Sequence, residues 1–91
     1  MTDVTRDTTI INKLGLHARA AAHLVSVTNQ YACQISIEKN GVRVDAKSIL
    51  GMMTLAAGPG TPIRIHCEGA DAEAAADAVC ACIANRFGEA E

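Results

Sequence analysis

Histidine is the residue type in this chain best suited to nucleophilic or acid–base chemistry near neutral pH, and the sequence contains three. His66 alternates with the apolar residues of a strand-like segment, and His23 lies inside a helical segment, off its apolar stripe. Both patterns predict ordinary surface histidines. His17 differs, because it stands where a glycine-containing loop becomes the start of a helix.

The position of His17 predicts a site that favours an anion. The first N–H groups of a helix have no partner within it, and they lie at the positive end of the helix dipole. A dianionic group would be stabilised there, and Arg19 would add a charge-assisted hydrogen bond. Because imidazole is a competent nucleophile and leaving group, His17 is suited to carry a phosphoryl group. The same spacing also suits a histidine that merely caps the helix.

Apolar periodicity predicts the four strands and three helices that would position these residues. A β-branched run marks a strand over 8–12, alternation marks a hairpin over about 34–45 with an Asn-Gly turn, and 63–67 alternate again. Helical spacing marks 18–29, 49–55 and the residues from 72 onward. Because each strand has one polar face, we expect an α+β fold: a two-layer open-faced sandwich, its four-stranded antiparallel sheet covered on one face by three helices.

Alanine-rich stripes should face the sheet, and Ser48 and Asp71 are placed to cap the second and third helices. The expected stripes are Ala18, Ala21, Ala22, Leu24, Val25 and Thr28 in the first helix, and Ala72, Ala75, Ala76, Val79, Cys80, Ile83 and Phe87 in the last. We expect residues 1–91 to form a single domain whose core spans about 7–88. Its ends, including the acidic tail 89–91, should fray.

Size and composition exclude several classes of function. A chain of 91 residues has no room for a separate cofactor domain. A net charge of −2, with one Tyr, one Phe and no Trp, argues against nucleic-acid binding. No segment resembles a signal peptide or approaches the roughly 18 consecutive apolar residues of a membrane span, so we expect a cytoplasmic protein without membrane insertion. The cysteines (Cys33, Cys67, Cys80 and Cys82) lack the spacing of a metal site, and we expect small buried hydrophobes and no metal or cofactor.

Two segments carry a resemblance to a known family. Residues 15–21 (GLHARAA) resemble the phosphorylation site of HPr, the histidine phosphocarrier of bacterial phosphotransferase systems, and residues 45–53 (DAKSILGMM) resemble its second signature. The resemblance covers about residues 7–88, and residues 12–15 are also similar to the nitrogen-branch paralogue NPr. Whether the chain would serve sugar transport or nitrogen regulation stays open.

The resemblance implies a mechanism. Enzyme I, phosphorylated by phosphoenolpyruvate, would pass its phosphoryl group to His17, on Nδ1 in the family, and Arg19 would stabilise the phosphate. Phospho-His17 would then donate to a histidine of an enzyme IIA protein. The chain would be a monomeric carrier and a substrate of other phosphotransferases, not an enzyme. The family usually has proline where Ala20 stands, which predicts a less rigid helix start.

Ser48 has two interpretations. It caps a helix, and the resemblance implies a target of HPr kinase/phosphorylase, whose phosphate would add charge and bulk to a docking face. The first 68 residues carry seven Lys and Arg against five Asp and Glu, so this part of the molecule is mildly basic. We expect a basic-rimmed apolar patch there that binds successive partners, formed by Ala18, Arg19, Ala20, Lys47, Ile49, Leu50 and Met53.

One alternative keeps the fold and changes the function. In it the chain is an HPr-like regulatory protein, His17 is vestigial, and partner binding depends on the phosphorylation state of Ser48. A small-ligand or metal-binding domain is a third possibility, which the absent ligand spacing disfavours.

Overall fold

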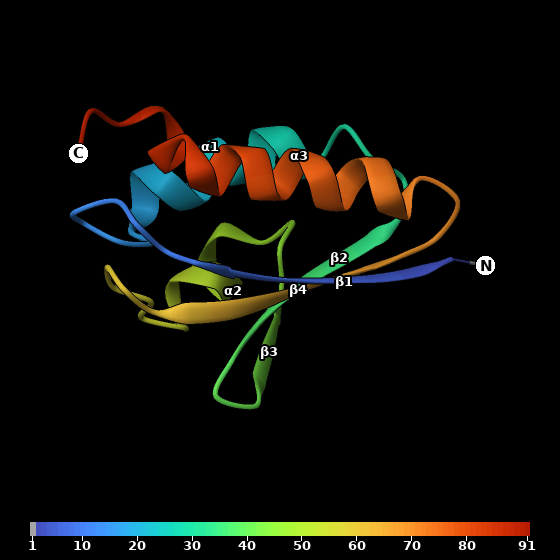
Figure 1. Cartoon of the computed structure of the whole chain (residues 1–91), viewed down its shortest axis with the longest axis horizontal. Coiled ribbons are helices and arrows are strands. Elements are labelled where there is room, and N and C mark those ends of the chain that lie inside the picture. The colour runs from blue at the N-terminus through green and yellow to red at the C-terminus, as the bar shows by residue number, and fades with distance from the viewer. Residues whose placement is uncertain (1) are drawn as a thin grey trace.

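Four strands form one antiparallel sheet in the order β1-β4-β2-β3 (Figure 1). The computed structural model describes residues 2–91. The edge strands are β1 (Asp3–Thr9) and β3 (Val42–Asp45), and the inner strands are β2 (Gln34–Lys39) and β4 (Pro62–Glu68). The inner strands β2 and β4 alternate as predicted, so one face of the sheet is apolar there and the other is polar.

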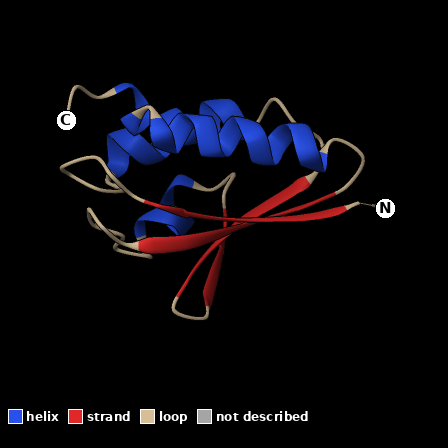
Figure 2. Ribbon diagram, viewed as in Figure 1, coloured by secondary structure: helices blue, strands red, loops and turns tan. Residues whose placement is uncertain are grey.

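Three helices complete a two-layer fold. Helices α1 (Ala18–Thr28) and α3 (Ala72–Ala84) lie over one face of the sheet, and the short α2 (Ile49–Met53) packs against α1 and β3 (Figure 2). A 3-10 turn, η1 (Arg86–Gly88), follows α3 and contacts α1. This arrangement confirms the predicted fold class. No helix within residues 2–91 is both long enough and apolar enough to cross a membrane.

The first strand lies elsewhere than predicted: it spans Asp3–Thr9, not 8–12. Only Val4 in it is buried, so the segment carries no apolar alternation to detect. Its partner β4 holds it by continuous pairing, from Asp3 opposite Glu68 to Thr9 opposite Pro62. The apolar Ile10 belongs instead to the loop after the strand, where it is fully buried.

Two predicted helix stripes need correction. In α1 the buried residues are Ala20, Ala21, Leu24 and Thr28, so Ala18 and Ala22 face solvent and Ala20 belongs to the core. In α3 the residue Cys82 is buried and Cys80 only half-buried. Phe87 is buried as predicted but belongs to η1, since α3 ends at Ala84. The core that results is made largely of alanine and β-branched side chains.

Asp71 occupies the N-cap position of α3, as predicted, but it does not cap. Its carboxylate accepts hydrogen bonds from the backbone N–H groups of Ala32 (2.8 Å) and Cys33 (2.9 Å). These bonds lower the pKa of Asp71, the one from Ala32 most strongly. Asp71 therefore ties the loop before β2 to the start of α3.

The prediction of small buried residues is confirmed for three of the four cysteines and not for Cys80, which is half-buried. Cys33, Cys67 and Cys82 are buried, and all four are free. Burial raises the pKa of Cys33 and of Cys82 to about 11, which disfavours the reactive thiolate.

Candidate functional site

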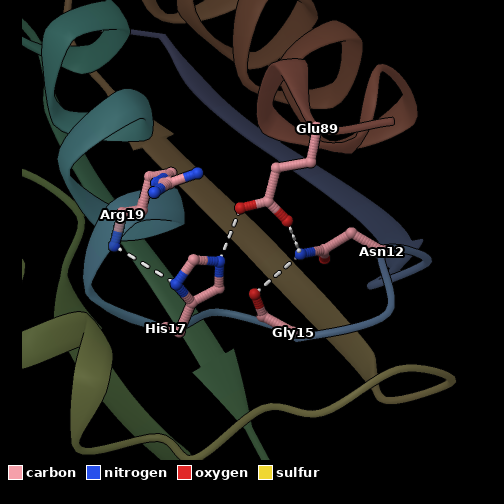
Figure 3. Close-up of polar contacts among 5 residues, drawn as sticks. All are labelled: Asn12, Gly15, His17, Arg19 and Glu89. Atoms are coloured by element: carbon pink, nitrogen blue, oxygen red, sulfur yellow. Dashed lines mark hydrogen bonds and ion pairs between the residues drawn. The ribbon is translucent and has the colours of Figure 1, made fainter. Parts of the chain in front are cut away.

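His17 is the N-cap residue of α1, where the sequence placed it. Its Nδ1 accepts a hydrogen bond from the backbone N–H of Arg19 at 3.3 Å (Figure 3). The side chain is 28% exposed, so the ring is reachable from solvent while one edge rests on the helix start. A nitrogen at this position faces N–H donors at the positive end of the helix dipole.

The loop before His17 is held by a close approach of two backbones. Gly15 has a φ of +70°, and a Cβ there would lie 2.4 Å from the carbonyl oxygen of Ala57. The backbone N–H of Leu16 donates to that same oxygen at 2.8 Å, and the Leu16 side chain is buried. These contacts fix the direction in which His17 enters the helix.

The opposite edge of the ring meets a residue that the sequence analysis missed. His17 Nε2 lies 2.5 Å from Oε2 of Glu89, in the tail that we expected to fray. Asn12 Nδ2 donates to Oε1 of Glu89 at 2.8 Å and to the carbonyl oxygen of Gly15 at 2.8 Å (Figure 3). Asn12 is fully buried. Residues from the two ends of the chain thus hold His17 from one side.

A run of left-handed residues carries Glu89 to this position. After α3 the φ angles of Arg86, Phe87 and Gly88 are +54°, +53° and +79°. They reverse the chain, and the buried Phe87 anchors the turn against the core. The backbone N–H of Lys13 also donates to the carbonyl oxygen of Glu91 at 2.7 Å. No motif in the sequence signals this arrangement, because it depends on three successive left-handed residues.

These contacts assign the protonation of the ring. Nδ1 accepts an N–H, so it carries no proton, and Nε2 is then the protonated nitrogen that donates to Glu89. The Asn12 hydrogen bond lowers the pKa of the Glu89 carboxyl most strongly, and the His17 hydrogen bond lowers it further, while partial burial opposes both. An ionised Glu89 is the acceptor that this tautomer requires. The Nδ1 lone pair of His17 is therefore unprotonated and points at the Arg19 N–H, at the N-terminus of α1.

Arg19 lies on the same side of His17 as the tail. The positive charge of Arg19 acts on Glu89. Arg19 also lines a hollow, together with Lys13, Leu14, His23 and the tail. Arg19 is exposed. A second, shallower hollow joins His17 to Met53 of α2.

The predicted docking patch is exposed in its α2 part. Ile49, Leu50 and Met53 face solvent, and Leu50 is 76% exposed. Leu14, which the sequence analysis missed, is 67% exposed and borders the hollow at His17. Ala20 does not belong to the patch, because it is fully buried under α1. Lys47 is half-buried, and its Nζ donates to the carbonyl oxygen of Tyr31 at 2.7 Å.

Ser48 caps α2 as predicted. Its Oγ accepts a hydrogen bond from the backbone N–H of Gly51 at 3.0 Å, and it stands directly before the exposed Ile49. Its hydroxyl is thus next to the docking patch.

Of the other two histidines, His23 lines the hollow beside Arg19 and the tail, and His66 lies on the polar face of the sheet. His23 is exposed on α1, as expected. His66 is only half-exposed, in contrast to the expectation, because its Nε2 lies 2.7 Å from Oε1 of Glu38 across the polar face of the sheet. Within residues 2–91 no cluster of three or more His, Cys, Asp or Glu side chains is arranged to hold a metal ion.

Comparison with known proteins identifies the family. The family model of the HPr component phosphorylation site of the phosphotransferase system matches residues 4–85. The chain is 55% identical over 86 residues to the phosphocarrier protein HPr of Cupriavidus necator, covering 94% of this chain and 97% of that protein. It is 42% identical over 90 residues to the phosphocarrier protein NPr of Shewanella violacea, covering 99% of each. The crystal structure of HPr-C-His from Thermoanaerobacter tengcongensis matches all of both chains with a TM-score of 0.89 and 41% identity. The chain therefore belongs to the HPr family of phosphocarrier proteins of the phosphotransferase system.

Proposed function

We propose that this chain accepts a phosphoryl group from phosphorylated enzyme I on His17 and passes it to an enzyme IIA protein in the cytoplasm. The observation that carries the proposal is the unprotonated Nδ1 of His17 at the N-terminus of α1, where its lone pair accepts the backbone N–H of Arg19. Nδ1 would release the Arg19 N–H and attack phosphorus while the bond between phosphorus and the donor breaks; the electron pair of that bond stays with the donor, and the released N–H can donate to a phosphoryl oxygen. Transfer to enzyme IIA repeats the step with His17 as the leaving group.

The surroundings of Nδ1 support this step. The incoming phosphoryl oxygens meet the unpaired N–H groups at the helix start, which favour negative charge. Arg19 stands two residues along and is exposed, so its guanidinium is free to follow the phosphate. We assign Arg19 to stabilising the charge on the phosphoryl group in both directions of transfer.

The partners would dock beside His17 on the exposed side chains of α2. Ile49, Leu50 and Met53 would supply an apolar surface, with Ala18 and Arg19 exposed at the start of α1 and Lys47 half-buried next to Ser48. Enzyme I and enzyme IIA would use this surface in turn, with the carrier acting as a monomer in brief, salt-sensitive encounters. Phosphorylation of Ser48 by an HPr kinase/phosphorylase would place a dianion beside Ile49 and weaken both encounters.

Labelling with phosphoenolpyruvate and enzyme I tests the proposal. We expect one acid-labile phosphoryl group per chain, seen by intact-protein mass spectrometry. His17→Ala should abolish it, and His66→Ala, which removes a histidine on the polar face of the sheet, should leave it unchanged. Labelling of His17→Ala at the wild-type rate would refute the site. Enzyme I proteins from the sugar and nitrogen branches, assayed side by side, should show which branch loads this chain faster.

A further inference from the structure

The contact between Glu89 and His17 has a chemical consequence. A neutral imidazole carries its single ring proton on either nitrogen, and only the form with the proton on Nε2 leaves Nδ1 free to attack. If Nε2 lost its proton, its lone pair would face an ionised carboxylate oxygen 2.5 Å away. The carboxylate therefore disfavours the unreactive form. The N–H of Arg19 acts in the same direction from the other edge of the ring, because it requires an acceptor at Nδ1.

Glu89 is itself held in place. Asn12 is fully buried and uses its side-chain N–H groups on two acceptors, Oε1 of Glu89 and the carbonyl oxygen of Gly15. The Glu89 side chain is 15% exposed, so few water molecules compete for its hydrogen bond to the ring. One carboxylate oxygen is committed to Asn12, which leaves the other for His17. The orientation of the ring thus depends on a buried amide as well as on the tail.

The same contact serves the phosphorylated state. When the Nδ1 lone pair forms the bond to phosphorus, the ring becomes positively charged and keeps its proton on Nε2. The ionised Glu89 lies against that charge. When the phosphoryl group leaves, the electron pair of the N–P bond returns to Nδ1, and again the Nε2 proton does not move. A fixed acceptor at Nε2 is therefore compatible with every step of a cycle of loading and unloading.

From these contacts we infer that Glu89 is a positioning residue for phosphoryl transfer: it holds His17 in the tautomer with a free Nδ1, and Asn12 orients its carboxylate for that task. The inference rests on the proposed function of His17. Its tautomer part concerns the unphosphorylated protein and is tested without any partner.

Glu89→Gln is the decisive variant. Asn12 Nδ2 must donate to the amide oxygen of the new side chain, so the amide NH2 group would face Nε2. An N–H donor there favours a bare Nε2 and a protonated Nδ1, which then opposes the Arg19 N–H. Glu91→Gln is the matched control, because it removes an exposed carboxylate of the same tail that pairs with Lys13 at 3.5 Å. Glu89→Asp keeps the charge and shortens the side chain.

The first measurement is the ring nitrogen chemical shifts of His17 by long-range 1H–15N correlation, at a pH where the ring is neutral. Wild-type protein and Glu91→Gln should show a protonated Nε2 and a bare Nδ1, and Glu89→Gln should move Nδ1 toward the protonated shift. The second is the rate of labelling by enzyme I, which should fall at least about tenfold in Glu89→Gln, remain unchanged in Glu91→Gln and recover partly in Glu89→Asp.

The outcomes separate this inference from the proposed function. An unchanged His17 tautomer in Glu89→Gln overturns the inference, whatever the labelling assay gives. A shifted tautomer with an undiminished labelling rate overturns the positioning role and leaves the carrier function standing. Absence of labelling in the wild-type protein counts against the proposed function. Thermal unfolding of each variant checks that the fold is intact.

Discussion

Leu50 and Met52, two positions apart in the five-residue helix α2, lie in opposite environments: Leu50 is 76% exposed and Met52 is fully buried. A large apolar side chain that contributes little to the core but stays exposed fits the proposed docking patch, and Met53 of the same helix borders the hollow at His17. Under the proposed function, α2 is anchored by Met52 and its exposed side chains bind partners.

Truncation of these two residues should separate stability from docking. Leu50→Ala should change the free energy of unfolding by less than about 0.5 kcal/mol, because the side chain is exposed. It should still raise the KM of enzyme I for this chain. Met52→Ala should destabilise the fold by about 2–5 kcal/mol through loss of a buried side chain. Urea unfolding and labelling kinetics measure the two effects, and an unchanged KM in Leu50→Ala would remove Leu50 from the docking patch.

The loop before His17 should be intolerant of a Cβ at Gly15. Alanine in the left-handed region costs about 1–2 kcal/mol for the backbone alone. Gly41→Ala measures this backbone cost alone, because Gly41 lies in the Asn-Gly turn with a φ of +82° and open space around it. Gly15→Ala should be more destabilising than Gly41→Ala, because its Cβ would overlap the carbonyl oxygen of Ala57. Equal unfolding free energies for the two variants would contradict this close approach.

The features that sequence reasoning predicted correctly are local ones. The strands of the hairpin alternate over neighbouring residues, and the helix starts at His17 and Ser48 depend on residues within one turn. The fold class follows from the sum of such local patterns. The four-stranded sheet and its helical layer were therefore predicted correctly, although the predicted position of β1 was wrong. The sequence of β1 has no apolar alternation that would mark it as a strand. Its backbone pairing with β4 holds it in the sheet.

The features that escaped prediction are long-range. Glu89 and His17 are 72 positions apart, and their contact depends on the left-handed turn through Arg86 and Phe87. Ala20 carries the same side chain as its exposed neighbour Ala18, so composition could not tell which of them faces the core. Residues that act on His17 through space leave no periodic signal in the sequence.

Acid should release the tail from the site. The pKa of Glu89 is lower in the folded protein than its ordinary value of 4.5, so ionised Glu89 stabilises the fold above that value and this contribution is lost as the pH falls through the folded value. Wild-type protein should be more stable than Glu89→Gln at neutral pH, and the difference should shrink at about pH 3. Urea unfolding at both pH values measures it. A difference that grows in acid would contradict an ionised Glu89 in the folded state.

The capping role of Ser48 and the effect of a negative charge at its position can be tested separately. Ser48→Ala removes the acceptor for the Gly51 N–H and should destabilise the protein by about 0.5–2 kcal/mol, with little effect on labelling of His17. Ser48→Asp keeps a side-chain acceptor at the N-cap, so its stability should stay near that of the wild type. Its added negative charge stands directly before Ile49, and labelling by enzyme I should slow most at low salt, where charges are least screened. Labelling of Ser48→Asp at the wild-type rate under those conditions would show that a charge at this position does not control docking.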